Sequence, residues 1–197
     1  SFSMPEGDYM VVVGTNGSGK TTLMNALSGT FPPDEGSIVL DGKEITSWKE
    51  HQRAEFIGRI FQNPFSGTAP DMTIAENLAL ASYRGRARGL RKAVDKESRE
   101  EFRRRVQSLN MGLEERLDNP IGTLSGGQRQ ALTLLMATWI KPRLLLLDEH
   151  TAALDPKTAG LVIELTEKII RKERLTTLMV THSMQQAINL GNRLIMM

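Results

Sequence analysis

A glycine-rich loop between a short apolar run and a helical run constrains this chain most strongly. Residues 14–21 read Gly-Thr-Asn-Gly-Ser-Gly-Lys-Thr, which has the spacing G-x-x-x-x-G-K-[ST] of a phosphate-binding loop. The apolar run Tyr9–Val13 predicts a buried strand before the loop, and residues 22–28 predict a helix after it. A phosphate-binding loop requires this order of strand, loop and helix. A plain glycine-rich turn is the alternative interpretation.

The residue types in this segment, which we call the phosphate loop, suit the binding of a triphosphate. Its glycines let the backbone curl so that successive N–H groups point at one anion, and the helix N-terminus adds partial positive charge. Lys20 can reach the outer phosphates, and Thr21 can offer a hydroxyl to Mg²⁺. We expect a nucleoside triphosphate to contact the loop and the residue after it: Gly14, Thr15, Asn16, Gly17, Ser18, Gly19, Lys20, Thr21 and Thr22.

Composition narrows the class of protein further. A length of 197 residues suits one domain, and a net charge of +2 does not call for a nucleic-acid or membrane partner. The chain has no cysteine, so it forms no disulfide. No apolar run approaches the roughly 18 residues of a membrane-spanning helix, and residues 1–7 do not resemble a signal peptide. We expect a fragment cut at both ends, because the chain starts without methionine and stops inside a predicted strand at residues 193–197.

Short apolar segments predict a mainly parallel sheet covered by helices, because strands buried on both faces read as near-continuous apolar runs. Tyr9–Val13 is one such segment, and residues 144–147 and 178–180 are two more. Residues 36–40, followed by Asp41-Gly42, predict a strand that enters a hairpin, and residues 57–61 predict another strand. The expected fold class is therefore α/β, with flanking helices and a small antiparallel piece.

The middle of the chain has a helical character. Residues 73–82, 102–109 and 113–117 carry the apolar positions of this region. We expect a helical subdomain at about residues 63–140, inserted in a single domain of residues 1–197. The chain returns to the sheet at residue 144, so the insertion is not a separate domain.

A further helix is predicted to start after Asp155, a natural cap that precedes proline. Leu161, Leu165 and Ile169 follow at intervals of four residues. We expect this stripe to pack on the sheet.

Two carboxylates follow the apolar run 144–147. The C-terminal ends of parallel strands are where ligands bind in open α/β sheets, and Asp148 and Glu149 stand at such an end. Beside a phosphate loop, Asp148 would orient Mg²⁺, and Glu149 would polarise the water that attacks the γ-phosphate. An acidic loop or a helix cap is the alternative.

A second helix N-terminus suits an anion. Residues 124–128 read Leu-Ser-Gly-Gly-Gln and open an apolar helix that runs to about Trp139. Ser125 is a natural N-cap, and the paired glycines leave the amides uncovered. Taken alone, this segment is an ordinary glycine-rich cap. Together with the phosphate loop, it leaves open whether the chain binds two anions or shares one with a second copy.

The phosphate loop, the LSGGQ segment and the strand with Asp148 and Glu149 resemble the nucleotide-binding domain of ABC ATPases in their order and distances. The resemblance spans essentially the whole chain. In that family two domains pair head to tail, and each ATP lies between one copy's phosphate loop and the other copy's LSGGQ. The resemblance implies that four residues contact an ATP held by a second copy: Ser125, Gly126, Gly127 and Gln128.

Weaker positions also match the family. The resemblance implies that Gln62 touches Mg²⁺ near the membrane partner, that His182 contacts the γ-phosphate, and that Asp155 crosses the dimer interface. Without it, Gln62 is a loop residue and His182 a histidine beside a helix cap at Ser183. The implied catalytic residues are Glu149, His182, Gln62 and Lys20, and the implied Mg²⁺ residues are Thr21, Gln62 and Asp148.

Two departures from the family stand out. His150 stands where the family usually has proline. Because this change removes no catalytic group, we expect ATPase activity to survive. Asp148, Glu149 and His150 are a poor metal site, because adjacent strand residues alternate faces. The aromatic residue that stacks on adenine in the family lies further upstream of the loop than this chain reaches, and Tyr9 is inside the strand.

An arginine-rich stretch at residues 84–105 invites a nucleic-acid interpretation. It holds eight arginines, but four acidic residues intervene and aromatic residues are sparse. Binding to single strands combines a basic groove with stacking aromatics, so a solvated helical face is the better interpretation.

These features together indicate an ATP-hydrolysing subunit of a bacterial ABC importer at the cytoplasmic face of the membrane. Its expected partners are a second copy, transmembrane permease subunits and, through them, an extracytoplasmic solute-binding protein, with no nucleic acid. A soluble ABC ATPase of DNA repair or translation is one alternative. A regulatory module without turnover is another, against which Glu149 and His182 argue.

Overall fold

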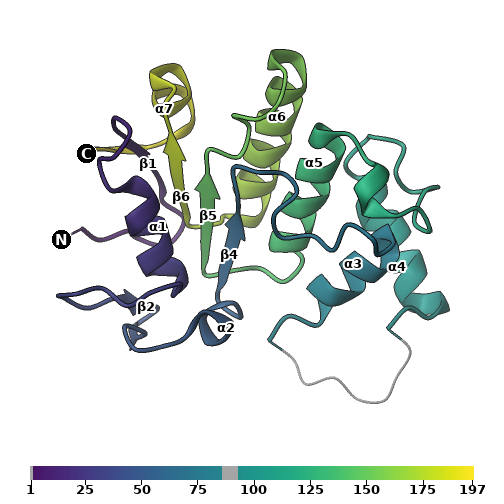
Figure 1. The fold of residues 1–197 in the computed structure, drawn as a ribbon, viewed down its shortest axis with the longest axis horizontal. Coiled ribbons are helices and arrows are strands. Elements are labelled where there is room, and N and C mark those ends of the chain that lie inside the picture. The colour runs from purple at the N-terminus through teal and green to yellow at the C-terminus, as the bar shows by residue number, and fades with distance from the viewer. Residues whose placement is uncertain (1, 86–92) are drawn as a thin grey trace. The chain divides into compact units, whose positions relative to one another are not determined.

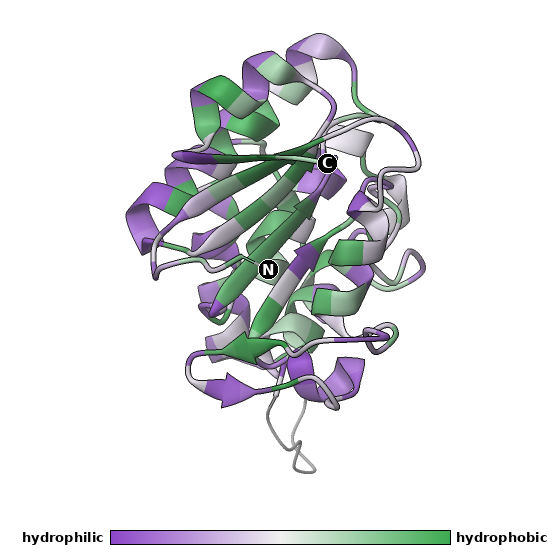
Figure 2. Cartoon of the chain, turned by 90° about the vertical axis from the view of Figure 1, so that its left-hand side faces the viewer, coloured by the Kyte–Doolittle hydropathy of each residue, from purple (hydrophilic) through white to green (hydrophobic). Residues whose placement is uncertain are grey.

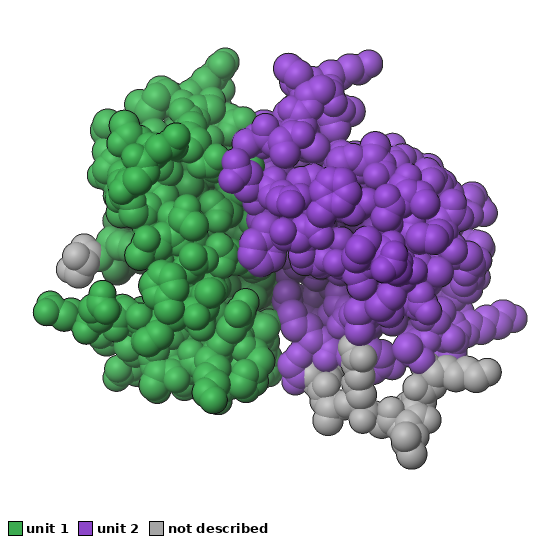
Figure 3. Space-filling view, viewed as in Figure 1, with its two compact units in different colours: residues 1–60, 141–149, 167–197 green, residues 61–140, 150–166 purple. Residues whose placement is uncertain are grey.

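The computed structural model describes residues 2–85 and 93–197. They fall into two compact units, which Figure 3 colours separately. Unit 1 comprises Ser1–Ile60, Lys141–Glu149 and Glu167–Met197, and unit 2 comprises Phe61–Ile140 and His150–Thr166.

Unit 1 is built on a five-stranded sheet of order β4-β5-β6-β1-β7, in which every neighbouring pair is parallel (Figure 1). The strands are β1 Tyr9–Val13, β4 Ile57–Ile60, β5 Leu144–Asp148, β6 Thr177–Thr181 and β7 Arg193–Met196. The expected α/β fold with a mainly parallel sheet is therefore confirmed. Each predicted strand of the sheet lies within about one residue of its observed position.

The central strands of the sheet are apolar because both of their faces are covered. All five residues of β1 and all five of β6 are buried, and Figure 2 shows much of the sheet in the hydrophobic colour. Met10, Val12, Leu146 and Leu178 belong to the core of unit 1, together with Met24 from the first helix. The sheet thereby fixes the C-terminal ends of β1, β5 and β6, where the phosphate loop and the predicted catalytic side chains of unit 1 lie.

The remaining elements of unit 1 are short. The helices are α1 Lys20–Ser28, α2 Glu50–Arg53 and α7 Met184–Leu190, and the strands β2 Val39–Leu40 and β3 Lys43–Glu44 form the antiparallel piece. The expected hairpin is confirmed, since Asp41 and Gly42 both have positive φ, 52° and 74°, as a tight turn requires. The predicted strand at 36–40 is shorter than expected and pairs at Val39 and Leu40.

Unit 2 is mainly helical. It contains α3 Ile74–Ser82, α4 Lys96–Gln107, the 3₁₀ turn η1 Ile121–Thr123 and α5 Gly126–Ala137. Leu78, Phe102 and Leu135 represent its core. Leu113 and Leu117 belong to the same core, although residues 113–117 form turns and no helix.

Helix α6, Pro156–Glu173, begins where predicted. The Thr158 N–H donates to Oδ1 of Asp155 at 3.1 Å, and hydrogen bonds from Thr158 lower the pKa of that carboxyl. The predicted apolar stripe is wrong at Leu161, which is 52% exposed, whereas Leu165 is partly buried against the core of unit 2. The buried positions are Val162, Thr166 and Ile170, one residue further along. A threonine at the centre of the buried face breaks the apolar pattern that the sequence shows.

The solvated face predicted at residues 84–105 is wrong at its first residue. The Arg84 guanidinium is partly buried and donates to the carbonyls of Ala137 and Ile140, at 2.9 and 2.7 Å. Burial also lowers the pKa of Arg84. Residues 86–92 of this stretch lie outside the described part of the chain. No helix within residues 2–85 and 93–197 has the length and apolar character needed to cross a membrane.

Candidate functional site

The phosphate loop leaves β1 and enters α1 at the N-terminus of that helix. Gly17 and Gly19 have φ of 82° and 96°, a region that glycine adopts without strain. Gly19 is the N-cap of α1, and no side-chain oxygen of this residue accepts a hydrogen bond from the first turn. The first N–H groups of the helix therefore remain available to an anion. Gly14 is tightly enclosed, since a Cβ there would lie 2.6 Å from Oγ of Ser18.

Lys20 is held inside the phosphate loop. It is 6% exposed, and its Nζ donates to the carbonyl oxygens of Gly14 at 3.0 Å and Thr15 at 2.7 Å. The ammonium charge is thus concentrated at the same place as the loop amides. Thr21 and Thr22 follow on the first turn of α1, and both are exposed to solvent.

Glu149 and His182 lie together at the ends of β5 and β6. Nε2 of His182 is 2.5 Å from Oε1 of Glu149, and the two side chains are 45% and 13% exposed. Glu149 has φ of 45°, an uncommon conformation for a residue with a side chain, and its N–H donates to the carbonyl of Val180. Strain of this kind gathers at functional sites.

Asp148, the last residue of β5, forms an ion pair with a residue that the sequence did not single out. Nη2 of Arg59 lies 3.3 Å from Oδ2 of Asp148, and the side chains are only 12% and 14% exposed. A charge inside the buried strand β4 was the available signal, because such a charge requires a partner. The identity of the partner depends on the pairing of β4 with β5, which the sequence does not reveal.

His150 points away from the neighbouring carboxylates. It is 2% exposed, and its Nε2 lies 3.2 Å from Oγ1 of Thr166. That hydroxyl donates to the carbonyl of Val162, so it accepts from His150 and Nε2 carries the ring proton. Burial lowers the pKa of His150 to about 4, which keeps the ring neutral. The Nε2 atom of His150 is thus engaged by Thr166.

In unit 2, residues 124–128 form the predicted helix N-terminus. Oγ of Ser125 accepts from the N–H of Gln128 at 3.3 Å, and the Gln128 side chain accepts from the N–H of Ser125 at 3.2 Å. This reciprocal capping box fixes the first turn of α5. Gly127 is buried against α6, because a Cβ built there would lie 2.1 Å from Cγ2 of Thr158. A Cβ built at Gly126 would lie 3.1 Å from Cδ2 of Leu154, which is a less severe contact.

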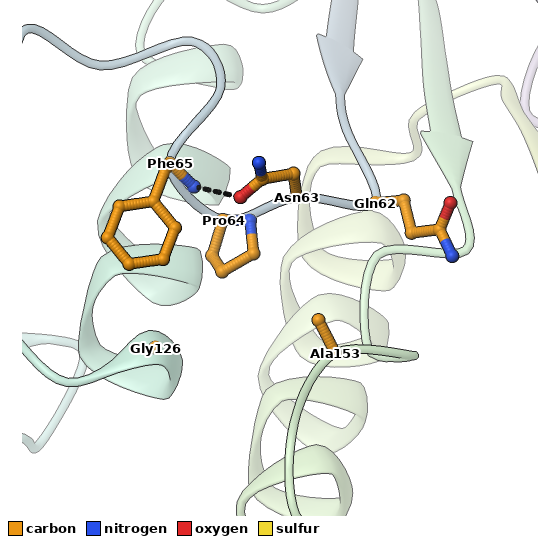
Figure 4. A pocket seen from close by; sticks show the side chains of 6 residues that line it. All are labelled: Gln62, Asn63, Pro64, Phe65, Gly126 and Ala153. Atoms are coloured by element: carbon orange, nitrogen blue, oxygen red, sulfur yellow. Dashed lines mark hydrogen bonds between the residues drawn. The ribbon is translucent and has the colours of Figure 1, made fainter.

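Gln62, the second residue of unit 2, borders an open pocket of about 370 Å³. Asn63, Pro64 and Phe65 continue its wall, which Gly126 and Ala153 complete (Figure 4). Oδ1 of Asn63 accepts from the N–H of Phe65 at 2.9 Å and shapes the turn after Gln62. Beneath the pocket wall the guanidinium of Arg129 stacks on the Phe65 ring, 4.0 Å from its centroid.

Each unit thus carries one part of the predicted site. Unit 1 brings together the phosphate loop and three side chains at the ends of adjacent strands: Asp148, Glu149 and His182. Unit 2 brings Gln62 and Gly126 to one pocket, with Ser125, Gly127 and Gln128 at the same helix end.

The residues in unit 1 suit a magnesium ion that arrives with a nucleotide. Thr21 and Asp148 offer hard oxygen donors, and Mg²⁺ is commonly held by one or two carboxylates together with substrate phosphates. Over residues 2–85 and 93–197 no group of three or more histidine, cysteine or acidic side chains is placed to hold a metal ion.

Comparison with known proteins identifies the family. The family model described as ABC transporter matches residues 1–152. The tyrosine transport ATP-binding protein of Clostridioides difficile (strain R20291) is 44% identical over 197 residues, covering 100% of this chain and 78% of that protein. The molybdate/tungstate import ATP-binding protein WtpC of Pyrococcus abyssi (strain GE5 / Orsay) is 36% identical and covers 98% of this chain, which spans 53% of that protein.

A solved structure agrees with these relatives. The dimeric post-hydrolysis structure of the ATP-binding cassette MJ0796, bound to ADP and Pi, superimposes with a TM-score of 0.81 at 27% identity, covering 100% of this chain and 83% of that one. The chain therefore belongs to the ABC transporter family. It is an ABC ATPase domain, and its relatives are ATP-binding proteins of transporters.

Proposed function

We propose that this chain is the ATP-hydrolysing subunit of an ABC importer, in which closure of a head-to-tail dimer over ATP drives solute import. The observation that carries the proposal is the gathering of four groups at the ends of adjacent parallel strands. These groups are the phosphate loop, Asp148, Glu149 and His182. Open α/β sheets bind ligands at this edge, and each group has the chemistry that phosphoryl transfer to water requires.

Hydrolysis proceeds by in-line attack of water on the γ-phosphate. Lys20 and the loop amides hold the phosphates and stabilise the charge that develops on them. Glu149 takes the proton of the attacking water, while His182 contacts the γ-phosphate. The contact between His182 and Glu149, at 2.5 Å, supports this pairing because it brings the base and the phosphate sensor to one point.

Thr21, Gln62 and Asp148 would hold the Mg²⁺ that accompanies the nucleotide. The ion would supply charge neutralisation at the phosphate oxygens. Asp148 is suited to the role because a carboxylate at the end of β5 faces the same sheet edge as the phosphate loop.

The second half of the ATP site comes from another copy of the chain. Ser125, Gly126, Gly127 and Gln128 present the N-terminus of α5, an electropositive group suited to the γ-phosphate. The capping box of Ser125 keeps this helix end ordered. Asp155, which caps α6, borders the same interface.

The partners follow from the family. Permease subunits bind the chain at the cytoplasmic face of the membrane, and an extracytoplasmic solute-binding protein delivers the solute to them. The chain acts as one ABC ATPase domain with a helical insertion near residues 63–140, and it does not bind nucleic acid. Since the permease contacts the solute, this chain does not select it.

Binding of ATP by Lys20→Ala tests the proposal. Loss of the ammonium removes a charge-assisted contact with the phosphates, so we expect ATP affinity to fall by roughly 30-fold or more. Lys168→Ala is the matched control, because Lys168 is an exposed lysine on α6. Equal ATP affinity of Lys20→Ala and the parent protein, measured by calorimetry, would remove the phosphate-loop assignment.

A further inference from the structure

Arg59 is a charged residue in a strand that is otherwise buried. It lies between Gly58 and Ile60 on β4, and its side chain is 12% exposed. Its guanidinium contacts Oδ2 of Asp148 at 3.3 Å, on the neighbouring strand β5. The pair therefore couples a buried arginine directly to the carboxylate proposed to hold Mg²⁺.

A second contact fixes the guanidinium. Nη1 of Arg59 donates to Oγ of Ser28 at 3.0 Å, and that hydroxyl donates in turn to the carbonyl of Asn25. Ser28 is the last residue of α1, the helix that starts in the phosphate loop. Because the arginine fork is planar and rigid, two nitrogen atoms held in this way set the position of the whole charge.

We propose that Arg59 is a resident counter-ion of Asp148 that weakens the binding of Mg²⁺ and sets how readily the ion leaves with ADP. The inference rests on the proposed role of Asp148 in holding Mg²⁺. Arg59 acts through Asp148 and is therefore a positioning residue.

The physical basis is competition for one carboxylate. The guanidinium neutralises part of the charge that attracts Mg²⁺, and it repels a second cation close by. Without Arg59, Asp148 would be a poorly exposed carboxylate that has no other ion pair among residues 2–85 and 93–197, a costly state that a divalent cation would relieve. Loss of the guanidinium also frees the rotamer of Asp148, but this entropic effect is smaller than the removal of a full charge at contact distance.

The test is the Mg²⁺ dependence of ADP binding, followed with a fluorescent ADP so that no turnover is involved. Arg59→Met keeps the apolar stem and removes the charge, and we expect half-saturation at roughly tenfold lower Mg²⁺. Arg59→Lys keeps the positive charge but lacks the planar fork, so its shift is expected to be smaller than that of Arg59→Met. Ser28→Ala removes the anchor and leaves both charges in place, so its shift is expected to be smaller than that of Arg59→Met.

Binding of ADP in EDTA provides the matched control. It is expected to be equal in all variants, since the phosphate loop itself is unchanged. A half-saturating Mg²⁺ concentration that is unchanged or raised in Arg59→Met would overturn the counter-ion role. If Arg59→Met does not fold, as judged by thermal unfolding, Arg59→Gln replaces it with a neutral, polar side chain. Should the parent protein bind ADP equally with and without Mg²⁺, the proposed role of Asp148 fails independently of Arg59.

Discussion

The close contact between Gly127 and Thr158 predicts how Gly127→Ala changes the stability of the protein. The change should reverse its sign when the γ-methyl group of Thr158 is removed. A Cβ at Gly127 would lie 2.1 Å from Cγ2 of Thr158 and 3.6 Å from its Cβ. The conflict is therefore with the γ-methyl alone. Gly127→Ala introduces the conflict, and Thr158→Ser removes the methyl while it keeps the hydroxyl.

The energies can be worked from this geometry. Alanine in place of glycine within a helix contributes about 0.5–1 kcal/mol to the stability of a protein. The substitution would therefore be stabilising at a position where the new methyl group meets no other atom. Overpacking by a methyl group costs about 1–3 kcal/mol, because Thr158 is β-branched and its rotamer is restricted in a helix. Gly127→Ala is thus expected to destabilise the parent protein by about 1–2 kcal/mol, and to be neutral or stabilising in the Thr158→Ser background.

Urea unfolding of the four proteins of this double-mutant cycle is the assay. Gly160→Ala is the matched control, since Gly160 lies on α6 with no atom within 4 Å of its Cβ position, and we expect it to stabilise. An equal loss of stability from Gly127→Ala in both backgrounds, or no loss in the parent protein, would refute the steric reasoning.

Two further predictions concern buried basic side chains. Arg53 is 1% exposed and donates to four main-chain carbonyls, so Arg53→Met is expected to cost about 3–5 kcal/mol in urea unfolding. Arg143→Met, at an exposed ion pair, should cost no more than about 1 kcal/mol, and equal losses would contradict the reasoning. The pKa of His150 is lowered to about 4, so the unfolded chain takes up the proton first as the pH falls. The difference between the His150 pKa of the folded and the unfolded chain contributes about 3 kcal/mol to the free energy of unfolding. This contribution is complete above pH 6.5 and is lost as the pH falls to 4. We expect the free energy of unfolding of His51→Gln to fall between pH 6.5 and 4 as in the parent protein, and that of His150→Gln to lack this fall. A fall of the same size in His150→Gln would contradict the prediction.

Much of the fold could be predicted from local pattern. The strands β1, β5 and β6 are continuous apolar runs, and such runs identify buried parallel strands without any knowledge of their neighbours. The turn at Asp41-Gly42 and the cap at Ser125 were likewise predictable, because their chemistry lies within four residues.

Other features depend on contacts that local pattern does not encode. The buried stripe of α6 has Thr166 at its centre, and that threonine is inside because His150 bonds to it. Arg84 is partly buried because carbonyls at the end of α5 accept from it. The ion pair of Arg59 with Asp148 requires the order of the strands in the sheet, which the sequence alone did not supply.

The catalytic assignment is tested most directly by ATP turnover of Glu149→Gln. The amide keeps the size of the side chain and cannot accept the proton of the attacking water, so we expect turnover to fall by roughly 10²–10⁴-fold. Glu164→Gln, at an exposed position on α6, is the matched control and should turn over ATP at the parent rate. The account predicts that Glu149→Gln binds ATP, fails to hydrolyse it and accumulates as an ATP-bound dimer in size-exclusion chromatography. Turnover of Glu149→Gln at the parent rate would contradict the account, since the base would then lie elsewhere.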